Sequence, residues 1–225
     1  MKRCLTYSIP VLFAASLLWS SAAQASIIFS NLGPSGTYDT ANSLIVGNDF
    51  VGDNLAEGDT FQASSNAIFG DFQVALSCIS ACPDPFTVAL TQDSGSDSPG
   101  TVIESFTDSG LLLGTAGNNN PLLAFDSVLH PTLTAGTSYW ITVSSDLNDS
   151  IAFSENITGD TSDEAISTDG GATYFSPSGL TPGAYQVDSA AQTAVTPEPD
   201  SFLLLASGLP LLAFARKFAS RNNAS

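Results

Sequence analysis

The chain has 225 residues, of which 22 are acidic and five are basic, giving a net charge of −17. All five basic residues lie near the two ends, whereas the stretch from Ser26 to Val195 holds 20 of the acidic residues and only the near-neutral His130 as a possible cation. Such a stretch cannot neutralise phosphates or form lysine and arginine salt bridges, which excludes nucleic-acid binding; its carboxylates must be hydrated, hydrogen-bonded or neutralised by bound cations.

The N-terminus has the layout of a secretory signal peptide, predicted over residues 1–25. Two basic residues precede an apolar run from Ile9 to Trp19, and Ala23 and Ala25 are the small residues of a signal-peptidase site. We expect signal peptidase to cut between Ala25 and Ser26, so that the rest of the chain is exported. An uncleaved signal anchor is the alternative, which the short apolar run disfavours.

Residues 26–190 are predicted to form one all-β domain, an antiparallel β-sandwich of jelly-roll type. Short runs that alternate between apolar and polar residues recur between clusters of turn-forming residues. Their number favours a sandwich, and the lack of a fixed repeat argues against a propeller or solenoid. The predicted strands are 26–30, 44–46, 60–63, 71–78, 86–91, 102–106, 122–129, 138–144, 151–154, 164–167, 172–175 and 184–187.

A candidate calcium site lies early in this domain, in the glycine-punctuated stretch from Gly47 to Asp59. The candidate ligands are Asp49, Asp53, Glu57 and Asp59, because calcium takes hard oxygen ligands on flexible loops. The spacing matches neither an EF-hand loop nor a glycine-rich nonapeptide, so a hydrated acidic loop is the alternative. No other cofactor is expected.

Cys78 and Cys82 are the cysteines that remain once the signal peptide is removed. The exported setting permits oxidation, so we expect a structural disulfide in the loop that connects the predicted strands 71–78 and 86–91 as neighbours. Two free thiols are the alternative. Half of a metal site is disfavoured because His130 is the only histidine that could complete it.

Catalysis has weak candidates in this chain. The tripeptides Asp93-Ser94-Gly95 and Asp108-Ser109-Gly110 could place a nucleophilic serine near His130, but no strand-to-helix nucleophile elbow surrounds them. Pairs of carboxylates suited to glycoside hydrolysis are no evidence for that activity here, because any chain with 20 acidic residues contains such pairs. We therefore expect a protein that is not an enzyme.

Exposed aromatic residues would suit a carbohydrate-binding sandwich, because rings stack on sugars. Core packing is the other interpretation of the same residues. The candidates are Tyr139, Trp140, Tyr174, Phe175 and Tyr185.

Two segments, 133–143 and Asn31-Leu32-Gly33, are similar to the choice-of-anchor (R-like) domains, which are bacterial surface modules attached to varied anchoring tails. A third segment, Ser167-Thr168-Asp169-Gly170-Gly171-Ala172-Thr173-Tyr174, resembles the Asp box, a hairpin of sialidases and other secreted β proteins. This resemblance implies a structural role, in which Asp169 bonds backbone groups of its own turn and Tyr174 packs beneath it. It does not imply sialidase activity. The matching positions are Ser167, Asp169, Gly171, Thr173 and Tyr174.

The C-terminal tail has three parts in a fixed order, after a predicted linker over residues 191–196. Pro197-Glu198-Pro199 is followed by Asp200, which can cap a helix, and then by an uncharged segment from Ser201 to Ala215. We expect a transmembrane helix over about residues 201–218 that ends at a basic cluster, with the C-terminus in the cytoplasm. A buried core helix is the alternative. The basic residues are Arg216, Lys217 and Arg221.

This tail, residues 197–221, resembles the PEP-CTERM sorting signal of Gram-negative bacteria that make extracellular polysaccharide. The resemblance rests on Pro197-Glu198-Pro199, the apolar segment with Gly208 and the terminal basic residues. It implies recognition by an exosortase, a membrane-embedded cysteine transpeptidase that would cut near the motif. Pro210 inside the apolar segment and the interruption of the basic run at Phe218-Ala219-Ser220 depart from the family pattern.

These observations together predict an exported structural or adhesive protein of the cell surface or extracellular matrix. Its expected partners are signal peptidase, an exosortase, the inner membrane during sorting and extracellular polysaccharide. The final location is the outer surface or the matrix of a Gram-negative bacterium. A secreted carbohydrate-binding or calcium-binding module is the alternative, followed by a glycan-active hydrolase.

Overall fold

The computed structural model describes residues 25–48, 52–80, 82, 85–108, 114–145, 148 and 150–191. Most of the predicted signal peptide and the whole predicted sorting signal, including Pro197-Glu198-Pro199, lie outside the described residues. Residues 24–192 form one compact unit. Within the described ranges no helix has the length and apolar character needed to cross a membrane.

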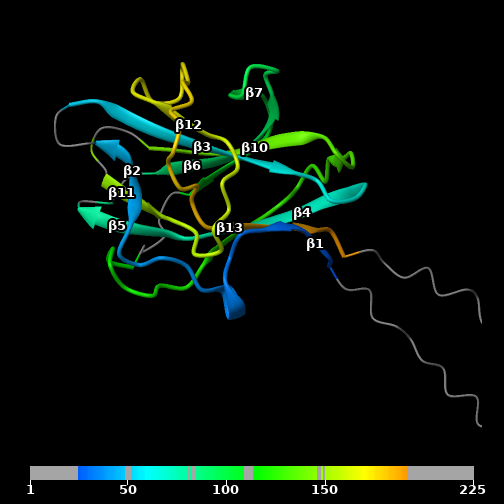
Figure 1. The fold of residues 1–225 in the computed structure, drawn as a ribbon, viewed down its shortest axis with the longest axis horizontal. Helices are drawn as coiled ribbons and strands as arrows, with labels where there is room; N and C mark the ends of the chain where they lie inside the picture. The colour runs from blue at the N-terminus through cyan, green and yellow to red at the C-terminus, as the bar shows by residue number, and fades with distance from the viewer. Residues whose placement is uncertain are drawn as a thin grey trace, which may run out of the picture. The chain divides into compact units, whose positions relative to one another are not determined.

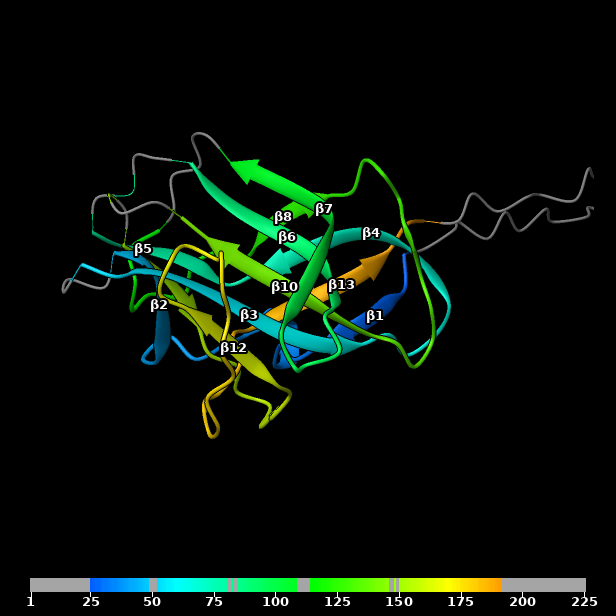
Figure 2. The same ribbon diagram turned by 90° about the horizontal axis from the view of Figure 1, so that it is seen from above.

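Two antiparallel sheets pack face to face, as the sequence predicts for a sandwich (Figures 1 and 2). The five-stranded sheet has the order β1 (Ile27–Ser30), β13 (Tyr185–Ser189), β4 (Ala67–Val74) and β8 (Leu123–Asp126), with β9 (Thr132–Leu133) also paired to β4. The eight-stranded sheet has the order β5 (Leu76–Ser80), β11 (Ser150–Ser154), β2 (Ser43–Asn48), β3 (Asn54–Gln62), β10 (Ser138–Ser144), β6 (Phe86–Asp93) and β7 (Pro99–Asp108), with β12 (Glu164–Ser167) paired to β3. A short 3-10 turn, η1 (Pro34–Gly36), follows β1.

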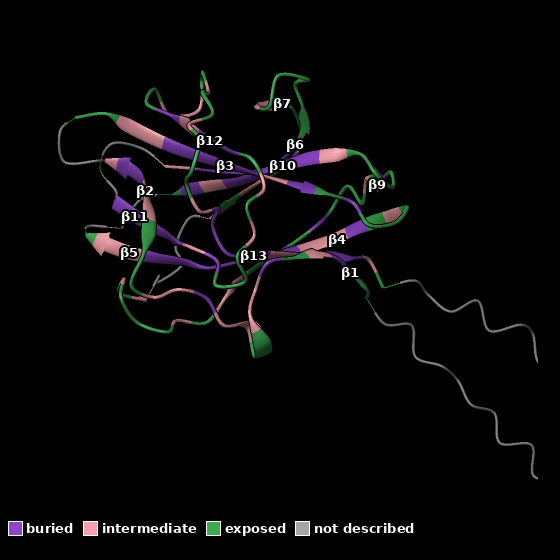
Figure 3. Ribbon diagram, in the orientation of Figure 1, coloured by how far each residue is buried: buried purple, intermediate pink, exposed green. Residues whose placement is uncertain are grey.

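The core lies between the sheets, and the strands of both sheets contain buried stretches (Figure 3). Phe72 and Val74 of β4 meet Ile141 and Val143 of β10 in one cluster, and all four side chains are buried. Phe61 stacks on its cross-strand partner Tyr139, with ring centroids 5.8 Å apart. Along β4 and along β10 these core residues are two positions apart, which is why short amphipathic runs specify the two sheets.

The predicted strand 71–78 is two strands, because the chain changes sheets at Ala75. The N–H group of Ala75 donates to the carbonyl of Ala184, and its carbonyl accepts from the N–H group of Ser154. Both backbone groups of the crossing residue are thereby satisfied, as burial requires. The apolar positions Phe72, Val74 and Leu76 still face one core, so the alternation continues through the crossing.

Several other strand predictions differ from the structure, and one strand was missed. Residues 172–175 are not a strand; only Phe175 forms an isolated bridge, with Ile166. The strand predicted at 60–63 begins earlier, at Asn54, because its first half pairs with three different strands. The two-residue strand β9 was not predicted.

The Cys78–Cys82 disulfide is present, with the Cα atoms 5.9 Å apart. The strands on either side of it are not neighbours, contrary to the expectation for 71–78 and 86–91. β11 lies beside β5, with Ile151 opposite Cys78, and four strands separate β5 from β6 in the sheet order. Alternation in the sequence indicates which residues face the core but not which strand lies alongside.

The first and last strands of the domain lie side by side. β13 is paired on one flank with β1 and on the other with β4. The N–H group of Ser189 donates to the carbonyl of Ser26, and the N–H group of Ser26 donates to Oγ of Ser189. The two ends of the domain therefore leave from the same part of the five-stranded sheet.

Replacing both Cys78 and Cys82 with alanine should lower the free energy of unfolding by about 2 kcal/mol, because the bridge restricts a short loop in the unfolded chain. Urea denaturation of the oxidised chain and of the double variant measures the difference. Dithiothreitol should destabilise the natural sequence by a similar amount and leave the double variant unchanged. Equal stability of the oxidised and reduced natural chain would contradict a stabilising disulfide.

Candidate functional site

The most unusual feature of the core is that β3 turns two carboxylates toward the sandwich interior. Glu57 and Asp59 lie on the same face of β3 as Phe61, because side chains two residues apart share a face. Their cross-strand partners on β10 are the core residues Val143 and Ile141. Only 2% of Glu57 and none of Asp59 is exposed to solvent.

A third carboxylate comes from the neighbouring strand β12. Glu164 is directly opposite Asp59 in the antiparallel pairing of β12 with β3, and it is 4% exposed. Residues directly opposite each other in a sheet project to the same face. One oxygen from each of Glu57, Asp59 and Glu164 lies within 4.8 Å of the others. We call these three residues the buried carboxylate cluster.

The buried carboxylate cluster has few hydrogen-bond donors. Oδ2 of Asp59 accepts from the N–H group of Gly183 at 3.1 Å. Five other oxygens are buried and find no partner in the described part of the chain: Oδ1 of Asp59 and both carboxylate oxygens of Glu57 and of Glu164. Leaving a buried polar atom unpaired costs about 1–3 kcal/mol, and more when the group is charged.

The environment opposes ionisation of all three carboxyl groups. Burial, followed by repulsion from neighbouring carboxylates, raises the pKa of Glu57 and of Asp59 well above the usual range. Burial and the nearby Glu155 raise the pKa of Glu164 to about 7. Asp160 adds further repulsion at Asp59. The natural chain has no lysine or arginine between Ser26 and Val195 that could offset these charges.

The calcium ligands predicted from the sequence are only partly brought together. Glu57 and Asp59 do lie side by side, but on strand β3 rather than on a flexible loop. Asp53 is exposed just before β3 and is not part of the buried carboxylate cluster. Asp49 lies outside the described residues.

Glu164 was missed because its role depends on pairing. The alternation in residues 164–167 predicts a strand, yet it does not indicate that β12 lies against β3 in the register that places Glu164 opposite Asp59. The sequence did contain a signal for the other two members of the cluster. Glu57, Asp59 and the core residue Phe61 are each two residues apart, which is the spacing of side chains on one face of a strand.

Glu104 shows how this domain stabilises a buried carboxylate without a lysine or arginine. Its oxygens accept from Oγ of Ser127 at 2.7 Å and from the N–H groups of Val128 and Leu129 at 2.7 and 3.0 Å. Burial opposes ionisation here too, but these donors outweigh it, so the pKa of Glu104 is lowered. Among the described residues, the buried carboxylate cluster has one such donor, the N–H group of Gly183.

The Asp-box-like turn is held by the same kind of contact. Asp169 accepts from the N–H and hydroxyl groups of Thr173 at 2.8 and 2.7 Å, and from the hydroxyl of Ser167 at 2.7 Å. Oγ of Ser167 in turn accepts from the N–H group of Gly171. These hydrogen bonds lower the pKa of Asp169 to about 2. The bond from the Thr173 N–H group is the backbone contact that the resemblance implies, and the geometry is that of a structural turn.

Tyr174 packs against this turn. Its side chain is half-buried, and burial raises its pKa to about 12. A Cβ atom at Gly171, where φ is +94°, would come within 3.0 Å of the hydroxyl of Tyr174. Glycine at position 171 therefore serves both the backbone conformation and the close approach of the ring.

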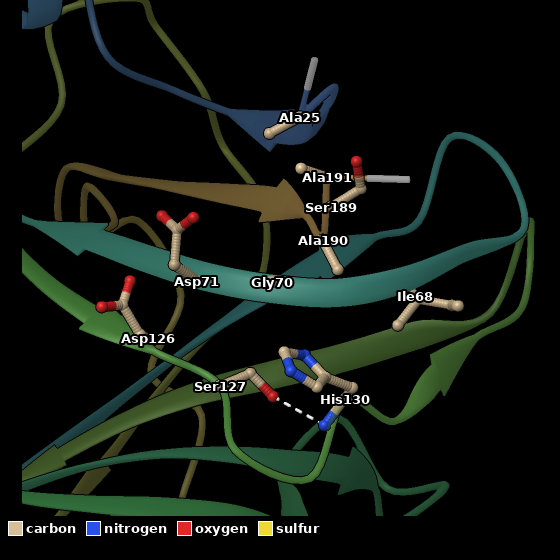
Figure 4. A pocket seen from close by; sticks show the side chains of 10 residues that line it. All are labelled: Ala25, Ile68, Gly70, Asp71, Asp126, Ser127, His130, Ser189, Ala190 and Ala191. Carbon is tan, nitrogen blue, oxygen red and sulfur yellow. Dashed lines mark hydrogen bonds between the residues drawn. The ribbon is translucent and has the colours of Figure 1, made fainter. Parts of the chain in front are cut away.

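His130 lies beside a shallow depression of about 540 Å³ that Ser127, Asp71 and Asp126 also line (Figure 4). Oγ of Ser127 accepts from the backbone N–H group of His130 at 2.9 Å, while the serine hydroxyl donates to Glu104. Nδ1 of the His130 ring is 3.3 Å from the carbonyl of Phe69. The serine proton is thus directed to Glu104 and not to the imidazole, unlike the arrangement of a nucleophilic serine.

Of the serines in the two Asp-Ser-Gly tripeptides, Ser94 is among the described residues. Oγ of Ser94 is 2.8 Å from Oγ of Ser98, within the loop between β6 and β7. Ser109 lies outside the described residues.

The five aromatic candidates for sugar stacking divide between core and surface. Tyr139, Trp140 and Tyr185 are buried, and Nε1 of Trp140 donates to Asp93. Tyr174 is half-buried, and Phe175 is 53% exposed. Core packing is therefore the correct interpretation for three of the five.

Comparisons with known proteins add no family to this picture: no family model matches the chain, and the search of curated proteins finds no significant match.

In the presence of a chelator, the domain should become less stable as the pH rises from 5 to 8. The pKa of Glu164 is raised, so its contribution is fully present below about pH 4.5 and is lost as the pH passes about 7. The shift corresponds to at most about 3 kcal/mol, because nearby solvent screens part of the repulsion. Glu57 and Asp59 act in the same direction, whereas Glu104 and Asp169, whose pKa values are lowered, change stability only at lower pH.

Urea denaturation at both pH values, with EDTA present, measures this loss. The isosteric variant Glu164→Gln serves as the matched control, because it cannot ionise at position 164, and it should lose less stability over the same range. Stability that is constant or increases between pH 5 and pH 8 would contradict the repulsion inferred here.

Proposed function

We propose that this protein is an exported, non-enzymatic structural or adhesive component of the cell surface or extracellular matrix, processed by an exosortase. The observation that carries the proposal is the order of residues in the tail. Pro197-Glu198-Pro199, an uncharged segment and the basic residues Arg216 and Lys217 follow the compact unit in the order expected of a sorting signal. The predicted signal peptide at the other end supports export.

The properties of the domain support an extracellular setting. It contains a disulfide, which persists in oxidising compartments. Because the domain lacks lysine and arginine, electrostatic repulsion disfavours its binding to nucleic acids and to anionic lipid headgroups. The hydrogen bonds of Ser127 and Ser94, described above, do not form a serine–histidine pair, which favours a role other than hydrolysis.

We include the jelly-roll type in the proposal. In the eight-stranded sheet, β11 lies between β5 and β2, and β10 lies between β3 and β6, so strands from distant parts of the chain interleave. Such interleaving is typical of jelly rolls and Greek keys.

Carbohydrate binding remains the second candidate function, and one surface favours it. A groove of about 320 Å³ on the outer face of the eight-stranded sheet is lined by Tyr174 together with Thr87, Thr91 and Thr142. A half-exposed ring beside hydroxyl groups is a common arrangement for holding a sugar. The extracellular polysaccharide is the glycan that the proposed location supplies.

The sorting proposal is tested by replacing Pro197, Glu198 and Pro199 with alanine in a bacterium that has an exosortase. The natural chain should mature to a shorter form at the surface or in the matrix. The variant should remain at full tail length in the inner membrane fraction. Immunoblots of fractionated cells measure both size and location.

A matched control replaces Thr193, Ala194 and Val195 with glycine, just before the motif, and should be processed normally. Unchanged size and location of the Pro197-Glu198-Pro199 variant would show that the motif does not direct sorting.

A further inference from the structure

We propose that Glu57, Asp59 and Glu164 bind one calcium ion between the two sheets of the sandwich. The proposal concerns the folded domain and does not depend on how the chain is sorted. It differs from the site predicted from the sequence, because Glu164 replaces Asp49 and Asp53 and the ligands come from two paired strands.

The spacing of the carboxylate oxygens suits this ion. Calcium binds oxygen ligands at 2.3–2.6 Å, so two ligands of one ion are at most about 5 Å apart. The candidate oxygens of Glu57, Asp59 and Glu164 all lie within 4.8 Å of one another. A single ion among them can therefore contact all three side chains.

The unpaired oxygens supply a separate observation. Five of the six oxygens of the buried carboxylate cluster have no hydrogen-bond partner among the described residues, although the side chains are at least 96% buried. Glu104, which is also buried, shows that this chain can provide donors to a carboxylate in its interior. A buried carboxylate without donors is expected to be paired or to coordinate a metal.

The ligand chemistry selects calcium among the common ions. All candidate ligands are carboxylate oxygens, whereas zinc prefers nitrogen and sulfur ligands. The two cysteines of the domain are joined in the disulfide, and His130 is not part of the cluster. Magnesium requires a near-ideal octahedron and retains several waters, which a largely buried cluster accommodates less easily than calcium.

A bound ion would join three parts of the domain. Glu57 and Asp59 belong to β3, and Glu164 belongs to β12. Asp59 also accepts from Gly183, which immediately precedes the segment leading into β13 of the opposite sheet. The ion would thus neutralise the repulsion inside the core and hold β12 and the Gly183 segment against β3. Glu155 and Asp160, which are partly exposed nearby, would attract the cation.

The test uses the purified full chain, freed of metal by a chelator and then dialysed at pH 7.5. Calorimetric titration with calcium chloride should give one strong site per chain, and calcium should raise the melting temperature. In the double variant Glu57→Gln, Glu164→Gln the affinity should fall by more than about 100-fold, because even outer-shell changes cost about 10- to 100-fold.

The metal-free double variant should melt at the same temperature as the metal-free natural chain or higher, because the substitutions remove buried repulsion. A variant that binds calcium less tightly but is no less stable without metal has lost the ion-binding site and not the fold. If the double variant does not fold, Glu164→Gln alone provides the same comparison. Asp126→Asn, which removes an exposed carboxylate outside the cluster, is the matched control and should bind calcium as the natural chain does.

Two results would overturn the proposal. One is the absence of calcium binding and of any melting shift in the natural chain at millimolar calcium, which would mean that the carboxyl groups are simply protonated. The other is undiminished binding by the double variant, which would place the ion at another group of acidic residues.

Discussion

The constraint on which this structure depends is the lack of any lysine or arginine between Ser26 and Val195. A buried carboxylate in such a domain can be stabilised only by N–H and O–H donors, by protonation or by a bound cation. Glu104 uses the donors of Ser127, Val128 and Leu129. In the part of the chain that the structure describes, the buried carboxylate cluster has a single donor, from Gly183, and therefore requires one of the other two solutions.

Strand β3 carries both core aromatic packing and the buried carboxylates that have no lysine or arginine partner. Phe61, near the end of the strand, packs against Tyr139 and Tyr185, whereas Glu57 and Asp59 bring charge into the same face. β3 is also paired with β2, β10 and β12. A change in the charge of this one strand consequently affects the contacts of three neighbours, so the cluster can influence the stability of the whole eight-stranded sheet.

The side chains that face the core could be predicted from the sequence, because the alternation of apolar and polar residues depends only on neighbouring positions in the chain. Phe72, Val74 and Leu76 are examples. The Cys78–Cys82 bridge was equally accessible, because its two residues are close in sequence. Pairing between distant strands could not be predicted, which is why β5 and β6 were wrongly taken as neighbours and Glu164 was overlooked. The first half of β3 was interpreted as a loop because Glu57 and Asp59 occupy positions that apolar residues usually fill.

The position of β13 between β1 and β4 has a mechanical consequence. A load applied to the chain beyond Ala191 and directed along β13 acts on hydrogen bonds to two neighbours at once. These bonds would be sheared together, whereas a load on Ser26 acts on β1, which is bonded to β13 alone in the sheet order. Resistance to such pulling is set by the rate of unfolding rather than by equilibrium stability. A pull on the C-terminal side of the domain therefore acts through a doubly paired strand, and a pull on the N-terminal side acts through the strand that is easier to peel away.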